Sequence, residues 1–424
     1  MQTELPRPDY RLRTKAEIRI AKSPRRKCGQ GLPGGLRAGA VVFAVALVTT
    51  GLAQAPFRHP GMLHSREDLE RMKTMVQQRR EPWASGFEEL KSHRESSATW
   101  KVRGPFERVV RDPGAELHRL EMDADANAAY QNALMWCITG NEAHARKAAE
   151  ILDAWSQTLK ALGGHDVELL AGLDGFKFAN AAELIRWTWA GWEQRRVETF
   201  AGMLTNLFLP RVRNFATFAN GNWDGACIKT VMGIGVFCDD RPIFELGVDY
   251  FYHGKGNGRL THYIINETGQ CQESGRDQGH AQLGLGQLAE ACQVGWSQGL
   301  DMFGAHQNRL LKGFEYTAKY NLGYEVPFVP YTDITGESEA VMISAARRGD
   351  LRPIYEMVLN HYQIRRGLDA PYTRMAAEKL RPEGAARYAD HPGFGTLLFS
   401  LGPLLPSGVT PPGGLKTNSP QSKP

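Results

Sequence analysis

The segment Ala281-Gln-Leu-Gly-Leu-Gly-Gln-Leu-Ala-Glu-Ala291 combines small residues with leucines and carries a single charge. Its apolar residues recur at three- and four-residue spacing, which predicts a helix. The segment Asp224–Phe237 has the same Gly/Ala-rich and almost uncharged composition. Because small residues let helix backbones approach closely, both segments suit a crowded inner layer of helices.

Most other segments beyond residue 60 also show helical periodicity. Glu142–Leu162 and Arg195–Phe218 carry charged faces, which is typical of helices in an outer layer. Strand-like alternation is confined to Leu260–Ile265. The remaining expected helices are Ser65–Gln78, Asp125–Thr139, Phe178–Trp192, Pro242–Tyr252, Asn308–Leu322, Glu337–Arg348, Pro353–Arg366, Pro371–Lys379 and Gly395–Leu401.

The alternation of charged and uncharged helices predicts an all-α fold of the (α/α) toroid type. Such a fold is an incomplete double ring in which the N-termini of the inner helices open on a central cleft. A simple helix bundle is the alternative, but it does not account for the alternation. We expect the toroid over residues 56–402 and a disordered, Pro/Gly-rich tail over residues 403–424.

The composition, 42% hydrophobic and 23% charged, is that of a globular protein. The formal net charge of +5 is unevenly spread along the chain. Residues 1–55 hold ten Lys or Arg and three acids, whereas residues 56–424 hold 41 basic and 43 acidic residues. The main body is therefore not globally basic, which argues against a nucleic-acid partner. An anionic ligand must be held by a local patch.

Residues 1–55 have the order of a secretory signal peptide. A long basic region ends at Arg37, an apolar run follows over residues 38–52, and Ala53-Gln-Ala55 provides small residues at cleavage spacing. The apolar run is shorter than the ~20 residues that a membrane span needs. We therefore expect cleavage near Ala55 and a periplasmic or secreted product without stable membrane association. A single-pass anchor is the alternative.

The sequence contains no recognisable motif for a metal or a cofactor. The five cysteines beyond the expected signal form no C-x-x-C pair, and there is no H-E-x-x-H, EF-hand, Walker or dinucleotide motif. The segment Gly254-Lys-Gly-Asn-Gly258 resembles a phosphate loop only in its glycine content, so we interpret it as a flexible loop. We predict neither a metal nor a cofactor.

The strongest candidate site is the run Gly269-Gln-Cys-Gln-Glu-Ser-Gly-Arg-Asp-Gln-Gly-His280. Each buried polar group needs a partner, so this density at a loop-to-helix junction favours a site over packing. Arg276 and His280 are four residues apart, which places them on one face of a helix. In the competing interpretation Arg276 pairs with Glu273 or Asp277, and His280 is a core histidine.

A second polar cluster, Asn220-Gly-Asn222-Trp223, opens the inner helix predicted from Asp224. An N-cap role explains Asn220 and also suits Asn222. An amide donor at the N-terminus of an inner helix also suits an anionic ligand. Trp223 offers a flat apolar face on which a sugar ring can stack, although core burial explains it equally well.

Three tyrosines and one histidine complete the candidate set. Tyr331 lies in an extended segment bracketed by prolines, which suits an exposed phenol. Tyr316 and Tyr320 are four apart on a predicted helix, where packing is the simpler interpretation. His361 lies in the middle of another predicted helix.

Five segments occur in order along the chain and together resemble one known family. They are His59-Pro-Gly-Met-Leu-His-Ser-Arg-Glu-Asp-Leu69, Tyr130-Gln-Asn-Ala-Leu134, Asn220-Gly-Asn-Trp223, Gln270-Cys-Gln-Glu-Ser-Gly-Arg-Asp-Gln-Gly-His280 and Glu315-Tyr-Thr-Ala-Lys-Tyr-Asn-Leu-Gly323. Through these segments the chain resembles the alginate-lyase domain family, whose members are secreted or periplasmic polysaccharide lyases with an (α/α)-toroid fold. The resemblance extends from about residue 59 to residue 401.

The resemblance implies β-elimination at a 4-linked uronic acid in an anionic polysaccharide, with alginate ahead of glucuronan or another polyuronate. In the family an Asn, helped by Arg or His, neutralises the C6 carboxylate, a His or Tyr removes the C5 proton, and a Tyr protonates O4. By position, the resemblance implies Asn222 as neutraliser and His280 as base or its assistant. Arg276 would contact the carboxylate or orient His280, and Tyr331 would be the acid or a shared acid and base, with Tyr320 and Tyr316 as rivals. The expected substrate-binding residues are Asn220, Trp223, Glu273, Gln278, Tyr320 and His361.

Two positions depart from the family pattern. Well-known members have His directly after the Asn, where this chain has Trp223, and Tyr seven residues after the Arg, where it has Leu283. Two other classes of function stay open on the residues alone. One is a glycoside hydrolase on the same toroid with Glu273 and Asp277 as its carboxylate pair. The other is a non-catalytic polysaccharide-binding protein.

Overall fold

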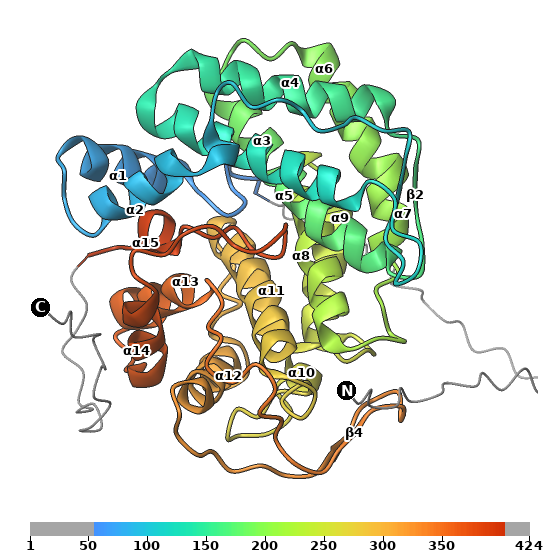
Figure 1. Cartoon of the computed structure of the whole chain (residues 1–424), viewed down its shortest axis with the longest axis vertical. Coiled ribbons are helices and arrows are strands. Elements are labelled where there is room, and N and C mark those ends of the chain that lie inside the picture. The colour runs from blue at the N-terminus through green and yellow to red at the C-terminus, as the bar shows by residue number, and fades with distance from the viewer. Residues whose placement is uncertain (1–54, 403–424) are drawn as a thin grey trace, which may run out of the picture. The chain divides into compact units, whose positions relative to one another are not determined.

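A computed structural model describes residues 55–402, and most of these residues are helical (Figure 1). The signal peptide and the tail that the sequence predicts lie outside the described residues, apart from Ala55. The helices are α1 (Arg66–Gln77), α2 (Trp83–Ser92), α3 (Arg119–Thr139), α4 (Glu142–Thr158), α5 (Val167–Thr188), α6 (Gln194–Met203), α7 (Leu209–Val212), α8 (Gly221–Phe237), α9 (Arg241–His253), α10 (Leu260–Tyr263), α11 (Gln278–Ser297), α12 (Ala305–Asn321), α13 (Tyr355–Asn360), α14 (Pro371–Leu380) and α15 (Gly395–Phe399). Strand β1 (Arg108–Val110) pairs in parallel with β2 (Ala161–Gly163), and β3 (Tyr331–Thr332) pairs antiparallel with β4 (Glu339–Ala340).

The inner layer consists of α3, α5, α8, α11 and α13, each of which contacts the next in this order. Almost every residue of α5, α8 and α11 is buried, so these helices have no solvent-facing side. Glycine makes the close packing possible: a side chain at Gly172 on α5 would collide with Ala226 on α8. Likewise, a side chain at Gly225 would collide with Gln287 on α11. The crowded inner layer that the sequence predicts is confirmed.

Amphipathic helices cover this inner layer from outside (Figure 1). Helix α4 packs against α3 and α5, α9 packs against α8, and α12 packs against α11. Helix α14 in turn covers α12 and α13, while α1, α2 and α15 connect the α13 end of the series to α3. Each outer helix buries one face and leaves the other to solvent, as the charged faces predict. The fold is an (α/α) toroid.

Some boundaries differ from the predicted ones. The prediction of a helix over Glu337–Arg348 is wrong. This segment forms β4 and an irregular stretch, whose backbone groups hydrogen-bond to the loop before α11 and to the start of α11. The N–H of Ser344 donates to the carbonyl of Ser274 (3.0 Å), and the carbonyl of Ala346 accepts from Gln278 (3.0 Å). The strand-like segment Leu260–Ile265 contains the short helix α10, and α5 begins at Val167, well before the predicted Phe178.

Within residues 55–402 no helix is both long and apolar enough to cross a membrane. In the same range no group of three or more His, Cys, Asp or Glu side chains is arranged to hold a metal ion. The five cysteines of this part of the chain are unpaired.

Candidate active site

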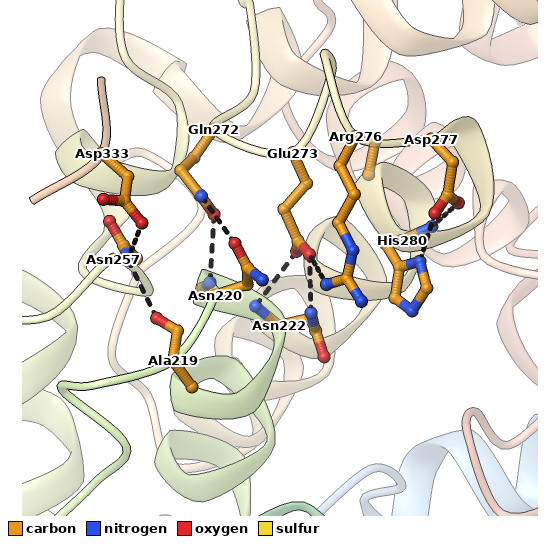
Figure 2. A network of polar contacts seen from close by, with 12 residues as sticks. Ala219, Asn220, Asn222, Asn257, Gln272, Glu273, Arg276, Asp277, His280 and Asp333 are labelled. Carbon is orange, nitrogen blue, oxygen red and sulfur yellow. Dashed lines mark hydrogen bonds and ion pairs between the residues drawn. The ribbon is translucent and has the colours of Figure 1, made fainter. Parts of the chain in front are cut away.

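Glu273 is the centre of a polar cluster between the N-termini of α8 and α11 (Figure 2). Its side chain is fully buried and accepts two hydrogen bonds from Asn222, one from the backbone N–H (3.2 Å) and one from Nδ2 (2.8 Å). The Tyr263 hydroxyl (3.2 Å) and Nη1 of Arg276 (2.8 Å) also donate to it. Burial raises the pKa of Glu273, while Arg276 acts in the opposite direction. The carboxylate therefore ties together three separate segments.

The first turn of α8 is closed by side chains of the loop before α11. Asn220 occupies the N-cap position, but its side chain does not cap the helix. Instead the Gln272 amide accepts from the N–H of Gly221 (3.1 Å) and donates to Oδ1 of Asn220 (2.9 Å). Together with Glu273, Gln272 satisfies the first N–H groups of α8. The helix N-terminus that we expected to face an anionic ligand is thus already occupied by an acid of the chain itself.

Asn222 lies in this first turn and is completely buried. Its Nδ2 atom bonds to Glu273, whereas its Oδ1 atom is buried without a hydrogen-bond partner among the described residues. Since buried polar atoms are nearly always paired, an unsatisfied amide oxygen next to Arg276 marks a place of functional interest.

His280 is held by Asp277 at the start of α11. Asp277 is the N-cap of the helix: one carboxylate oxygen accepts from the N–H of His280 (2.9 Å) and the other is 2.5 Å from its Nδ1. Burial alone would raise the pKa of Asp277, but these hydrogen bonds from His280 hold it below its usual value. The imidazole is fixed through Nδ1, which leaves Nε2 available to a ligand.

The cluster is open to solvent at its basic groups. The side chains of Arg276 and His280 are 41% and 34% exposed. They do not share a helix face as predicted, because α11 begins at Gln278 and Arg276 precedes the N-cap. Figure 2 nevertheless shows both side chains on the same side of the cluster, each beside its own acid. Three cavities of about 590, 630 and 920 Å³ lie elsewhere in the described chain.

The hairpin of β3 and β4 lies beside this cluster. Buried Asn257 donates to the Ala219 carbonyl (2.9 Å) and to Asp333 (3.1 Å), which links the hairpin to the turn before α8 (Figure 2). Ala340 on β4 packs so close to Gly275 that a side chain there would collide with it. The residue paired with Ala340 across the hairpin is Tyr331.

Tyr331 is half-buried, and its hydroxyl has no hydrogen-bond partner in the described part of the chain. Burial, reinforced by the nearby carboxylate of Asp333, raises the pKa of Tyr331 to about 12. The phenol is therefore protonated at neutral pH and able to donate.

The sequence profile of the alginate lyase family matches residues 88–327, which is 240 of the 424 residues. This chain belongs to the alginate lyase family. It is accordingly a polysaccharide lyase, as its resemblance to the family predicts. Among curated proteins none matches the chain significantly.

Solved structures of alginate lyases have the same fold. Alginate lyase A1-III from Sphingomonas species A1 has 14% identity and a TM-score of 0.59, covering 82% of this chain and 98% of that chain. An alginate lyase from Bacteroides ovatus has 13% identity and a TM-score of 0.55, covering 81% of this chain and 100% of that one. A variant of A1-III complexed with tetrasaccharide has 14% identity and a TM-score of 0.58, with coverage of 82% and 98%.

Two residues of this family member replace a His and a Tyr of the family pattern. Trp223 follows Asn222 on α8, where its half-buried ring lies edge-on to Phe218 (5.9 Å between ring centroids) and to His165 (6.1 Å). Leu283 is buried on α11, one turn after His280. Because position 223 holds a tryptophan, the imidazole beside Arg276 is that of His280. Position 283 holds a leucine and therefore provides no hydroxyl group.

The side chains of two further predicted residues, Gln278 and Tyr320, contact other parts of the protein and are not available to a ligand. The buried amide of Gln278 donates to the carbonyls of Ser274 and Ser344 and accepts from Asn321. Tyr320 is buried, with the guanidinium of Arg348 stacked 3.9 Å from its ring centroid.

His361 packs against Phe303 and Trp296, at the opposite end of α11 from His280. Burial lowers the pKa of His361 to about 3. The structure thus does not bring His361 to the cluster.

Sequence reasoning missed Tyr263, Asn257 and Asp333. The segment around Asn257, expected to be a flexible loop, is instead buried and hydrogen-bonded: the N–H of Gly258 donates to Asp224 (3.0 Å) and Asn257 is fully buried. No sequence signal marks Tyr263, whose ring packs so tightly against Gly221 and Gly284 in the structure that a side chain at either position would collide with it.

Proposed function

We propose that this polysaccharide lyase cleaves polymers of 4-linked uronic acid by β-elimination, with alginate as the first substrate to test. The observation that carries the proposal is the pair of exposed basic groups, Arg276 and His280, each fixed by its own acid. The chemistry needs a cation for the C6 carboxylate and a base for the C5 proton, and both are present side by side. Glucuronan or another polyuronate is the alternative substrate.

In this proposal Arg276 neutralises the substrate carboxylate. Only its Nη1 atom is engaged by Glu273 within the described residues, so its other N–H groups can form a bidentate pair with a carboxylate. The side chain of Asn222 is completely buried, so we assign it a supporting role: it holds Glu273, which in turn holds the guanidinium of Arg276. Neutralising the carboxylate makes the C5 proton acidic enough to remove.

His280 acts as the base in the proposed reaction. With Nδ1 donating to Asp277, the lone pair of Nε2 is free to accept the C5 proton. The Asp277 carboxylate then stabilises the imidazolium that forms, in the way that a buried acid supports a catalytic histidine.

Tyr331 is the proposed proton donor for the leaving O4. Its hydroxyl is unengaged and protonated at neutral pH, whereas the hydroxyl of its rival Tyr316 donates to the carbonyl of Pro327 (2.8 Å). The second rival, Tyr320, is buried under Arg348. Transfer of the phenolic proton to O4 completes the elimination and leaves a C4–C5 double bond in the product.

A glycoside hydrolase built on Glu273 and Asp277 receives no support from the geometry. Glu273 is buried beneath four donors, and Asp277 is bound to both the backbone and the ring of His280. Neither carboxyl is free to protonate a glycosidic oxygen or to attack an anomeric carbon.

The decisive experiment is an absorbance assay for unsaturated uronate products, run over a panel of mannuronate, guluronate and glucuronate polymers. We expect the signal to rise on at least one of them, and alginate first. Neutral glycans of similar length serve as the control. Release of reducing ends from a neutral glycan, with no unsaturated product from any uronate, would refute the proposal. The solved relative complexed with tetrasaccharide supports the use of tetrasaccharides among the test substrates.

We propose further that residues 1–55 direct export to the periplasm or the medium. The proposal rests on the basic region, the apolar run and Ala53-Gln-Ala55 in the sequence. Cell fractionation followed by N-terminal sequencing of the product tests it. We expect a mature N-terminus near Pro56, and retention of the intact chain inside the cell would contradict the proposal.

A further inference from the structure

A cavity of about 630 Å³ lies at the C-terminal end of α11. Its wall includes Arg58, Arg66, Arg71, Arg365, Trp296 and Ser297, and we name it the basic cavity. Trp296 and Ser297 are the last residues of α11, whereas His280 lies in its first turn. At a rise of ~1.5 Å per residue, about 25 Å of helix separates the two places. The basic cavity is therefore not part of the candidate active site.

Two guanidinium groups in the depth of this cavity share one carboxylate. Asp68 lies 2.5 Å from Nη1 of Arg71 and 3.8 Å from Nη2 of Arg365, and the two arginine side chains are only 18% and 19% exposed. Burial lowers the pKa of Arg365; Asp68 opposes this effect, and the neighbouring charge of Arg71 adds to it. A half-buried pair of cations with a single acid carries a positive charge that the chain does not balance.

The rim of the basic cavity adds to this excess. Arg58 and Arg66 are exposed there, and Glu67 is the other acid in the wall besides Asp68. Arg66 forms no ion pair within the described residues. His59, which also lines the cavity, is bound by Glu183 (2.7 Å) and Asp239 (2.9 Å), so its charge is already satisfied.

The rest of the wall suits a ligand larger than a simple anion. The half-buried ring of Trp296 adds apolar surface to the wall, and the guanidinium of Arg365 lies over this ring, 5.1 Å from its centroid. The Ser297 hydroxyl is buried in the wall and has no hydrogen-bond partner among the described residues. A volume of about 630 Å³ is within the range of organic-ligand sites and far exceeds what an inorganic anion fills.

We propose that the basic cavity binds a uronate oligosaccharide, as a second carbohydrate site remote from the candidate active site. The deep arginine pair and the rim pair would hold successive carboxylates, while Trp296 and Ser297 contact the sugar rings. The choice of a uronate as ligand rests on the proposed function. Such a site keeps the enzyme on its polymer, because two linked sites raise the effective concentration of substrate.

Binding is tested in the His280→Ala variant, in which the ligand stays intact. Titration calorimetry with a mannuronate tetrasaccharide is expected to show two sites per chain. Adding Arg365→Gln should remove one of them, or weaken it by about tenfold or more, since a charge-assisted contact is lost. Arg58→Gln with Arg66→Gln alters only exposed side chains, so it should weaken the same site without affecting the fold. Arg195→Gln, an exposed arginine elsewhere on the surface, should leave both sites unchanged.

Several outcomes would overturn the inference. A single site in His280→Ala, or two sites that none of the arginine variants affects, would exclude the basic cavity as a sugar site. Equal binding of a neutral glucose tetrasaccharide, or displacement of the uronate by equimolar phosphate, would exclude a uronate-specific site. Failure of the proposed function is recognised separately: the unaltered protein would then give no unsaturated product, whatever the calorimetry shows.

Discussion

The two ends of α11 hold their basic side chains in opposite states of charge balance. At the N-terminal end Arg276 and His280 each have an acid of their own, Glu273 and Asp277 respectively. At the C-terminal end two arginines share Asp68. A paired cation is fixed in orientation, whereas an unpaired excess attracts anions without fixing them as tightly. Basic groups held in a fixed orientation suit a chemical reaction, whereas an excess of positive charge suits the retention of a polyanion.

The largest expected effect separates the two ends by activity. We expect His280→Ala to lower kcat on a uronate tetrasaccharide by about 10²–10⁴, the usual contribution of a general base. Arg365→Gln at the other end should leave kcat nearly unchanged, because it lies far from the reacting atoms. Initial rates from product absorbance measure both, with circular dichroism as a check on folding. Comparable losses of kcat in the two variants would contradict the assignment of catalysis to the N-terminal end of α11 and of binding to its C-terminal end.

A smaller effect is expected for the proton donor next to the N-terminal end. Tyr331→Phe should lower kcat by about 10² and leave the melting temperature unchanged, since the lost hydroxyl has no partner in the described chain. Tyr316→Phe is the matched control, because it removes a hydroxyl that donates to Pro327. That control should cost about 1 kcal/mol of stability and keep kcat. The opposite pattern would move the acid role from Tyr331 to Tyr316.

Much of this arrangement is predictable from sequence, for a physical reason. The inner helices are recognisable because close backbone packing demands Gly and Ala, which leaves a composition that no outer helix shares. The polar run ending at His280 is recognisable because its side chains are too numerous to be buried without partners. The proximity of Asn222 to this run follows once both segments are placed at N-termini of neighbouring inner helices.

The partner of each side chain was not predictable in the same way. The sequence left open whether Arg276 pairs with Glu273 or with Asp277, and the structure selects Glu273, because Asp277 is the N-cap of α11 and bonds to His280. That choice depends on where the helix begins, and a shift of a few residues reverses it. Tyr263 and Asn257 belong to segments without a striking composition, and only the tertiary fold brings them to the cluster.

The smallest effect concerns the stability that the acid at each end of α11 contributes. The pKa of Asp68 and the pKa of Asp277 are both held below the usual value, so each contributes stability at neutral pH that is lost as pH falls through its folded-state pKa. At pH 7 we expect Asp68→Asn to cost about 2–3 kcal/mol, because it leaves Arg71 and Arg365 without a carboxylate. Asp277→Asn should cost only about 1 kcal/mol, because asparagine still caps the helix and His280 is partly exposed. Urea unfolding between about pH 7 and pH 2 measures both differences, which should shrink toward the acid end as the aspartates of the unaltered protein become protonated. Equal costs at the two ends, or differences that persist in acid, would contradict the contrast between shared and separate acids.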